Sequence, residues 1–193
     1  FDLSMSPGNP NPQYYAASPG VSVAMSQSSD GGIFHGGNVS PARKYLRRMM
    51  AMTVTATVVP MPMILLDYLL YYPFIDESST DEQLLTNSVA LPRYATGAGV
   101  QMMAVAVAAQ TGGQTFQVSY TNSDGVAGRT SKTVTMSTQS VNGTIVTTAS
   151  TNSGGPFIGL QNGDSGVRSI ESVTMNGIDV GLFTLVLVKP IAQ

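Results

Sequence analysis

Length, composition and charge limit the kinds of protein that this chain can be. It has 193 residues, of which 42% are hydrophobic but only 10% are charged, well below the ~25% of ordinary soluble domains. The net charge of −2 creates no general attraction to nucleic acid or membranes, and the absence of cysteine excludes disulfide scaffolds and thiolate chemistry. With a single histidine as well, we expect no metal, no cofactor, no nucleic acid and no membrane partner.

Residues 1–40 differ in composition from the rest of the chain. They are rich in Pro, Gly, Ser and Asn, and their few large side chains are scattered. Such a segment cannot bury enough apolar surface to offset the entropy lost on ordering. We therefore predict an extended N-terminal arm that another chain holds in place, with three apolar anchors, Tyr14, Tyr15 and Phe34.

A short basic helix is predicted over residues 41–52, linking the arm to the body. Ser40 is a favourable N-cap, and Pro41 is a favourable first helical residue. Four cationic side chains follow, namely Arg43, Lys44, Arg47 and Arg48. We interpret them as a docking patch for an acidic protein surface, because they are too few for a nucleic-acid footprint. The alternative is a helix whose long charged side chains simply remain solvated.

The body, residues 53–193, begins with strand signals. Residues 53–58 alternate between polar and apolar side chains, which predicts a half-buried strand. Residues 58–75 form the most apolar stretch, but three prolines and Asp67 favour one bent strand or two buried strands over a membrane-spanning helix. Residues 76–85 hold four carboxylates and predict a solvated loop.

The second half of the body carries clearer strand and turn signals. Phe116, Val118 and Tyr120 alternate with polar residues, and residues 122–125, Asn-Ser-Asp-Gly, predict a hairpin turn. Further strands are expected at 100–109, 129–137, 143–148, 157–160, 167–173 and 182–188. Many short strands without βαβ alternation predict an all-β fold, namely a jelly-roll-like β-sandwich with an extended N-terminal arm and one short helix.

One motif offers enzymatic chemistry. Residues 163–166, Gly-Asp-Ser-Gly, match the nucleophile motif of chymotrypsin-like serine proteases. His35 precedes Asp67 and Asp76, which precede Ser165, so the order of the triad also fits. However, these residue types also form β-turns, Val167 replaces the second glycine of the motif, and His35 lies in the arm. We therefore favour a structural turn and predict no catalytic residues and no enzyme activity.

Five stretches of the chain are distinctive. They are GGNVSPARKYL (36–46), DYLLYYPFID (67–76), LPRY (91–94), YTNSDGVAGR (120–129) and LVLVKP (185–190). Together they resemble virion structural proteins of tailed bacteriophages. The first four span residues 36–130, which is most of the body.

The resemblance implies a non-enzymatic capsid cement, or decoration, protein on the capsid exterior, because 193 residues are few for a major capsid protein. Sandwich cement proteins sit as trimers on local threefold axes. The resemblance therefore implies a homotrimer whose partner is the major capsid protein, with the arm gripping neighbouring capsid subunits. A tail, neck or fibre-base component and the major capsid protein itself remain alternatives. From other classes, a carbohydrate-binding sandwich and a serine protease remain open.

Overall fold

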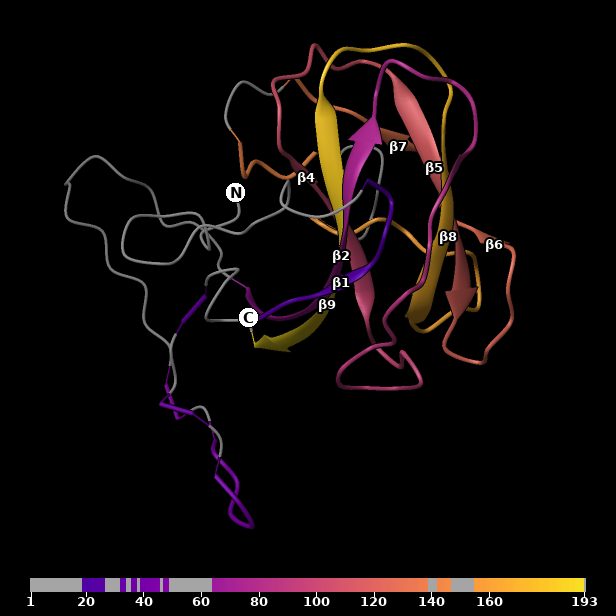
Figure 1. The fold of residues 1–193 in the computed structure, drawn as a ribbon. Coiled ribbons are helices and arrows are strands. Elements are labelled where there is room, and N and C mark those ends of the chain that lie inside the picture. The colour runs from indigo at the N-terminus through magenta and orange to yellow at the C-terminus, as the bar shows by residue number, and fades with distance from the viewer. Residues whose placement is uncertain are drawn as a thin grey trace, which may run out of the picture.

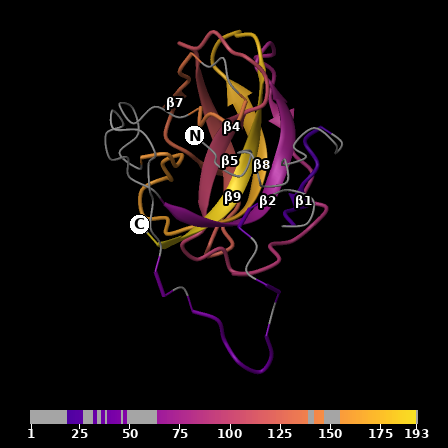
Figure 2. The ribbon, with the colours of Figure 1, turned by 90° about the vertical axis from the view of Figure 1, so that its left-hand side faces the viewer.

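The part of the chain that the structure describes is all-β. The structure is a computed structural model and describes residues 19–26, 32–33, 36–37, 39–45, 47–48, 64–138, 142–146 and 155–192. These residues form nine β-strands in two sheets that pack face to face (Figures 1 and 2). The predicted β-sandwich is confirmed.

Each sheet is built from strands that are distant in sequence. The first sheet has the order β1-β2-β9-β4, and the second has the order β3-β8-β5-β6, with β7 also paired to β5. In chain order the strands are β1 Val23–Ala24, β2 Leu65–Asp76, β3 Gln83–Leu84, β4 Gln101–Ala106, β5 Thr115–Asn122, β6 Arg129–Thr130, β7 Val134–Thr135, β8 Val167–Met175 and β9 Leu182–Ala192.

The strand pairs are nested like the layers of one long hairpin. β2 pairs with β9, β3 with β8 and β5 with β6, while β4 meets the segment around Ile145 through a bridge at Val105. The hairpin is rolled so that β9 also lies beside β4, and β8 beside β5. A rolled, nested hairpin in two sheets is the jelly-roll arrangement, as predicted.

The alternating pattern of β5 and its turn follow the sequence prediction. Phe116, Val118 and Tyr120 are fully buried, while the residues between them are partly exposed. After β5 the chain reverses, because Gly125 N donates to Asn122 O at 3.0 Å. The Asn122 side chain stabilises the same turn, since its Oδ1 accepts the N–H groups of Asp124 and Val126.

The apolar run before residue 76 forms one bent strand, β2. Its register against β9 shifts between Tyr72 and Ile75. Pro73 lies within this shift, where its missing N–H costs no ladder hydrogen bond. Asp67 does not break the strand, because its carboxylate pairs with Arg93 at 2.5 Å (Nη2 to Oδ1). Nowhere in the described residues does a helix reach the length and apolarity that a membrane crossing requires.

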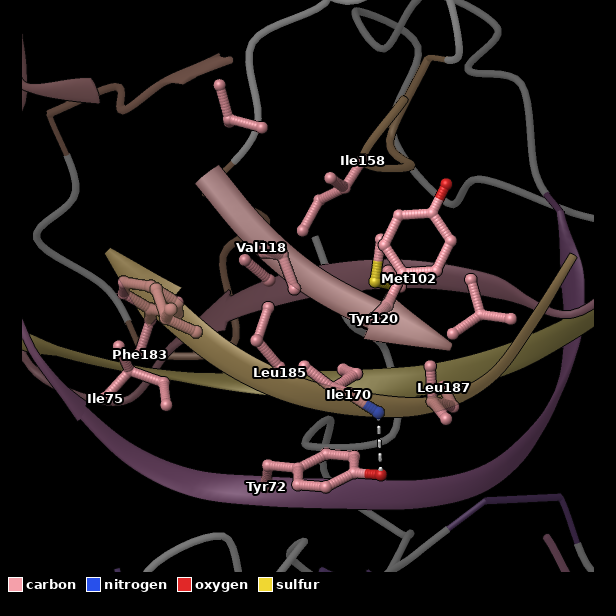
Figure 3. Packing of buried hydrophobic residues seen from close by; sticks show 14 of the residues in the cluster. Tyr72, Ile75, Met102, Val118, Tyr120, Ile158, Ile170, Phe183, Leu185 and Leu187 are labelled. Carbon is pink, nitrogen blue, oxygen red and sulfur yellow. Dashed lines mark hydrogen bonds between the residues drawn. The ribbon is translucent and has the colours of Figure 1, made fainter. Parts of the chain in front are cut away.

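A buried tyrosine bridges the two sheets through the core (Figure 3). The Tyr72 hydroxyl of β2 accepts the N–H of Ile170 in β8 at 3.2 Å and donates to Asn87 Oδ1 at 2.7 Å. Asn87 Nδ2 in turn donates to Ile170 O at 2.9 Å. Burial raises the pKa of Tyr72 to about 12, so the hydroxyl keeps the proton that it donates. The buried Tyr72 hydroxyl therefore has both a donor and an acceptor partner.

The structure differs from the sequence predictions at the basic helix and at two of the predicted strands. The basic helix predicted over residues 41–52 is not seen, because the described residues 41–45 and 47–48 are not helical. A short helix needs an apolar face to bury, and Tyr45 is 82% exposed. The strands predicted at 143–148 and 157–160 are reduced, within the described residues, to single bridges at Ile145 and Ile158. The strand predicted at 53–58 lies outside the described residues.

Two leucine-to-alanine variants test the position of the core. Leu185 is fully buried between the sheets, whereas Leu84 is 76% exposed. We expect Leu185→Ala to lower the free energy of unfolding by about 2–5 kcal/mol, and Leu84→Ala by about 0.5 kcal/mol or less. Urea denaturation followed by circular dichroism measures both values. Equal losses for the two variants would contradict this sandwich core.

Candidate functional site

Residues 19–26, the longest described run of the predicted arm, belong to the body of the protein. β1 pairs with the outer edge of β2, with Val23 opposite Tyr71. Gly20 N donates to Pro73 O and Met25 N to Leu69 O, both at 2.9 Å. This segment is therefore bound to the chain's own sheet.

The same segment also contacts the chain that follows β3. Ser22 N donates to Thr86 O at 2.9 Å, and Thr86 N donates to Gly20 O at 2.8 Å. The buried Ser22 hydroxyl accepts the N–H of Val89 at 3.0 Å. Residues 19–26 thus lie between β2, in the first sheet, and the segment that follows β3 of the second sheet. We call this segment the anchor.

The predicted interaction residues have different outcomes. Tyr14, Tyr15 and Phe34 lie outside the described residues. The basic side chains are exposed, as a docking patch requires, but no helix gathers them on one face; they are Arg43, Lys44, Arg47 and Arg48. Lys44 Nζ donates to Gly37 O, so this cation has a partner within its own segment.

The outer face of the first sheet is apolar. Residues facing outward from β2, β4 and β9 form a second apolar cluster, each member at least nine-tenths buried: Tyr71, Met103, Val105, Val107, Val186 and Val188. Val23 and Met25 of the anchor pack against this cluster. Their inward neighbours, such as Met102 and Leu187, belong to the core. The first sheet is therefore apolar on both faces, as is typical of strands covered on both sides.

The outer face of the second sheet is polar instead. Glu171 of β8 accepts hydrogen bonds there from Ser119 Oγ at 3.3 Å, from the Thr121 hydroxyl and from Gly128 N at 3.0 Å. A face satisfied by such polar contacts suits contact with water. The outer face of the first sheet is thus apolar and that of the second sheet is polar. The overall composition did not reveal this difference between the two faces.

The Gly-Asp-Ser-Gly motif forms a loop that Asp164 fixes to the β5–β6 hairpin. The Asp164 side chain is only 3% exposed and forms a two-point ion pair with Arg129 (Nε to Oδ2 and Nη2 to Oδ1, both 3.0 Å). It also accepts hydrogen bonds from Tyr120 Oη at 2.6 Å and Asn122 Nδ2 at 2.8 Å. The bond from Arg129, with those from Tyr120 and Asn122, lowers the pKa of Asp164 to about 2.

The rest of the motif also has structural roles. The Ser165 hydroxyl lies 3.0 Å from the Ser123 hydroxyl, which is not a base. A Cβ at Gly166 would lie 2.0 Å from Gly97 O, so only glycine permits this close approach of two backbones. His35, the base that a serine protease would need, lies outside the described residues. The contacts of Asp164 and Gly166 match the turn that the sequence analysis favoured.

A cavity of about 410 Å³ lies beside this loop. It is lined by residues 157–165 together with Gln101 and Lys132. Lys132 Nζ donates to Asn162 Oδ1 at 2.8 Å, and the Asp164 carboxylate is already fully engaged. Among the described residues, the lining includes the Ser165 hydroxyl and the Lys132 amine but no histidine and no cysteine.

The acidic segment 76–85 is only partly a solvated loop, which corrects the sequence prediction. Asp81 is exposed, but Glu77 is fully buried. Asp76 accepts the N–H of Ser78 at 2.8 Å, and its pKa is lowered by the bonds from Ser78. Spacing could not reveal the burial of Glu77, because the segments that cover it come from distant parts of the chain. Among the described residues, no group of three His, Cys, Asp or Glu side chains forms a metal centre.

Comparison with known proteins leaves the family open. No protein-family model, no curated protein and no solved structure matches this chain. The geometry described above and the resemblance of the sequence to phage virion proteins are therefore the two grounds for a functional proposal.

An Asp164→Asn variant tests the role of the ion pair in the loop. The folded-state pKa of Asp164 lies below its usual value of 3.8, at about 2. The ionised carboxylate therefore stabilises the fold above pH 3.8, and this stabilisation is lost as the pH falls toward 2. We expect Asp164→Asn to unfold at lower urea than the wild type at pH 5, and the difference to shrink between pH 3.8 and about 2.

Asp124→Asn is the matched control, because Asp124 lies exposed in the hairpin turn. Its unfolding midpoint should follow that of the wild type throughout this pH range. A difference between wild type and Asp164→Asn that does not change with pH would contradict an ionised, stabilising Asp164.

Proposed function

We propose that this protein is a non-enzymatic structural protein of a virion, namely a capsid cement protein that binds the outside of the assembled shell as a homo-oligomer. The observation that carries the proposal is the anchor, which fixes the N-terminal segment to the edge of a sheet that is apolar on both faces. The resemblance to phage virion proteins supplies the setting, the trimeric state and the major capsid protein as partner.

The two halves of the molecule suit different tasks in this role. The nested strand pairs and the buried Tyr72 bridge make the sandwich a body that resists deformation. The anchor gives the residues before it a fixed point of departure from that body. Residues 1–18, with Tyr14 and Tyr15, then reach neighbouring capsid subunits, and Arg43 to Arg48 add ionic contacts.

The mechanism of such a protein is thermodynamic. A ligand that binds only the assembled shell stabilises it by mass action. In a trimer, the first arm to bind holds the other two near their sites, so weak single contacts combine into strong attachment. The low fraction of charged residues fits a protein whose surface is largely covered by neighbours.

The contacts of the Gly-Asp-Ser-Gly loop favour this role over a serine hydrolase. Asp164 is engaged by Arg129, Tyr120 and Asn122, and Ser165 pairs with Ser123. Both motif residues thus have structural partners, and Asp67, an aspartate that a catalytic triad would use, pairs with Arg93. Labelling of Ser165 by a fluorophosphonate probe would favour the hydrolase instead.

Cryo-electron microscopy of virions from a phage that encodes this chain tests the proposal. We expect density for the sandwich in hundreds of copies on the outer surface of the head, grouped in threes. A few copies at one vertex would indicate a tail or neck component, and a continuous shell made of this chain would indicate the major capsid protein. Either result would contradict a cement protein.

Two N-terminal deletions separate shell binding from folding. Removing residues 1–18 leaves the anchor intact, so we expect an unchanged urea midpoint but at least tenfold weaker binding to undecorated shells. Removing residues 1–26 also deletes β1 and the bonds of Ser22, so the urea midpoint should fall as well. Sedimentation of the protein with shells measures binding. Full binding by the shorter deletion would contradict the role of the arm.

A further inference from the structure

Glu77 is a fully buried carboxyl without a hydrogen-bond partner. It lies directly after β2, and neither Oε1 nor Oε2 has a partner among the described residues. A carboxylate that is removed from water and receives no donor costs much more free energy than a neutral carboxyl in the same place. Burial of this kind therefore favours the protonated form of the side chain.

The β8–β9 loop, residues 176–181, lies directly on Glu77. The two segments are joined through their backbones, since Asp179 N donates to Glu77 O at 2.9 Å and Glu77 N donates to Gly181 O at 3.4 Å. A Cβ at Gly181, whose φ is +120°, would lie 3.0 Å from Glu77 Oε2. Glycine thus lets the backbone of the loop approach the carboxyl closely, and the loop helps to keep water away from it.

The loop carries a second buried carboxyl, that of Asp179. Its oxygens accept the N–H groups of Thr111 at 3.2 Å, Gly112 at 2.6 Å and Val180 at 2.7 Å. These bonds tie the loop to the segment that follows β4. Asp179 therefore has the donors that Glu77 lacks, and both carboxyls lie under the same loop.

No positive charge balances Glu77. Asp76 precedes it and Asp179 lies in the loop above it, whereas residues 107–114, the segment after β4, contain no titratable side chain. No ion pair joins Glu77 to a lysine or arginine of the described residues. Burial, and then the charges of Asp179 and Asp76, raise the pKa of Glu77 to about 8.

We propose that the Glu77 carboxyl is a proton-dependent latch, which holds the β8–β9 loop against the end of β2 while it is neutral and releases the loop when it is ionised. When Glu77 gives its proton to the solvent, its new charge is buried beside Asp179 without a compensating cation. Opening of the loop brings water to both carboxylates and relieves this cost. The latch does not rest on the virion role, so each can fail without the other.

A neutral Glu77 makes the fold more stable at low pH than at high pH. In the folded chain its pKa is about 8, above its usual value of 4.5. The stabilisation is therefore complete below pH 4.5 and is lost as the pH rises through 8. The urea midpoint of the wild type should fall over this range and level off above it.

NMR of the full wild-type chain measures the proton on Glu77 directly. The chemical shift of its carboxyl carbon, followed as the pH is raised, should give a midpoint near 8. A midpoint near the usual value of 4.5 would overturn the latch.

Hydrogen exchange shows whether the loop itself responds. The amides to follow are those of Thr111, Gly112 and Asp179, whose N–H groups hold the loop in place. After correction for the intrinsic exchange rate, we expect their protection to fall about tenfold or more between pH 6 and pH 8. The amide of Val118, within β5, should lose much less protection, because the sandwich stays folded.

Three variants assign the pH dependence to one group. Glu77→Gln keeps the size of the side chain but cannot ionise, so its loop protection should not change between pH 6 and pH 8. Asp81→Asn removes an exposed carboxylate of the same acidic segment, and His35→Asn removes the one histidine of the chain, the side chain that ordinarily titrates in this range. Both should keep the response of the wild type.

Constant loop protection in the wild type, or a pH response that persists in Glu77→Gln, would overturn the latch. Loss of the response in His35→Asn would do the same. If Glu77→Gln does not fold, the titration and the exchange of the wild type still decide, because neither depends on a variant.

Discussion

The pairing of β2 with β9 is the constraint on which the rest of the structure depends. These strands come from opposite ends of the body, and their ladder runs from Leu65 to Asp76. Once they pair, the segments between them must fold back as nested hairpins, and β9 becomes the template for β4. The free side of β2 then offers the edge on which the anchor adds β1. Tyr72 ties this ribbon to β8 across the core, so the two sheets cannot slide past each other without losing a buried hydrogen bond.

The two outer faces of the sandwich divide its possible roles. The strands of the first sheet are apolar on both faces, so both faces must be covered. On the outer face of the second sheet, the Glu171 carboxylate accepts hydrogen bonds from hydroxyl and backbone donors of the same chain. The anchor packs Val23 and Met25 against the apolar cluster on the outer face of the first sheet.

Asp164 and Glu77 show how strongly the surroundings decide what a carboxylate does. Asp164 receives an arginine, a tyrosine and an amide, so its charge strengthens the loop that it closes. Glu77 is equally hidden but receives no donor and faces another carboxylate. The first arrangement is complete within the chain. The second is incomplete within the chain, so burial and the nearby carboxylates favour the protonated form of Glu77.

The sequence by itself determined the fold class, the alternation of β5 and the hairpin turn at Asn122, because periodicity and turn chemistry are local properties. The continuous apolar runs of β4 and β9 also indicated strands that are buried on both faces of their sheet. Only the tertiary structure decided that the anchor joins the first sheet, that the described residues near Tyr45 form no helix, and that Glu77 lies buried beside the β8–β9 loop. Edge pairing, the covering of a helix face and the burial of a charge all depend on segments distant in sequence, whose contacts no local pattern records.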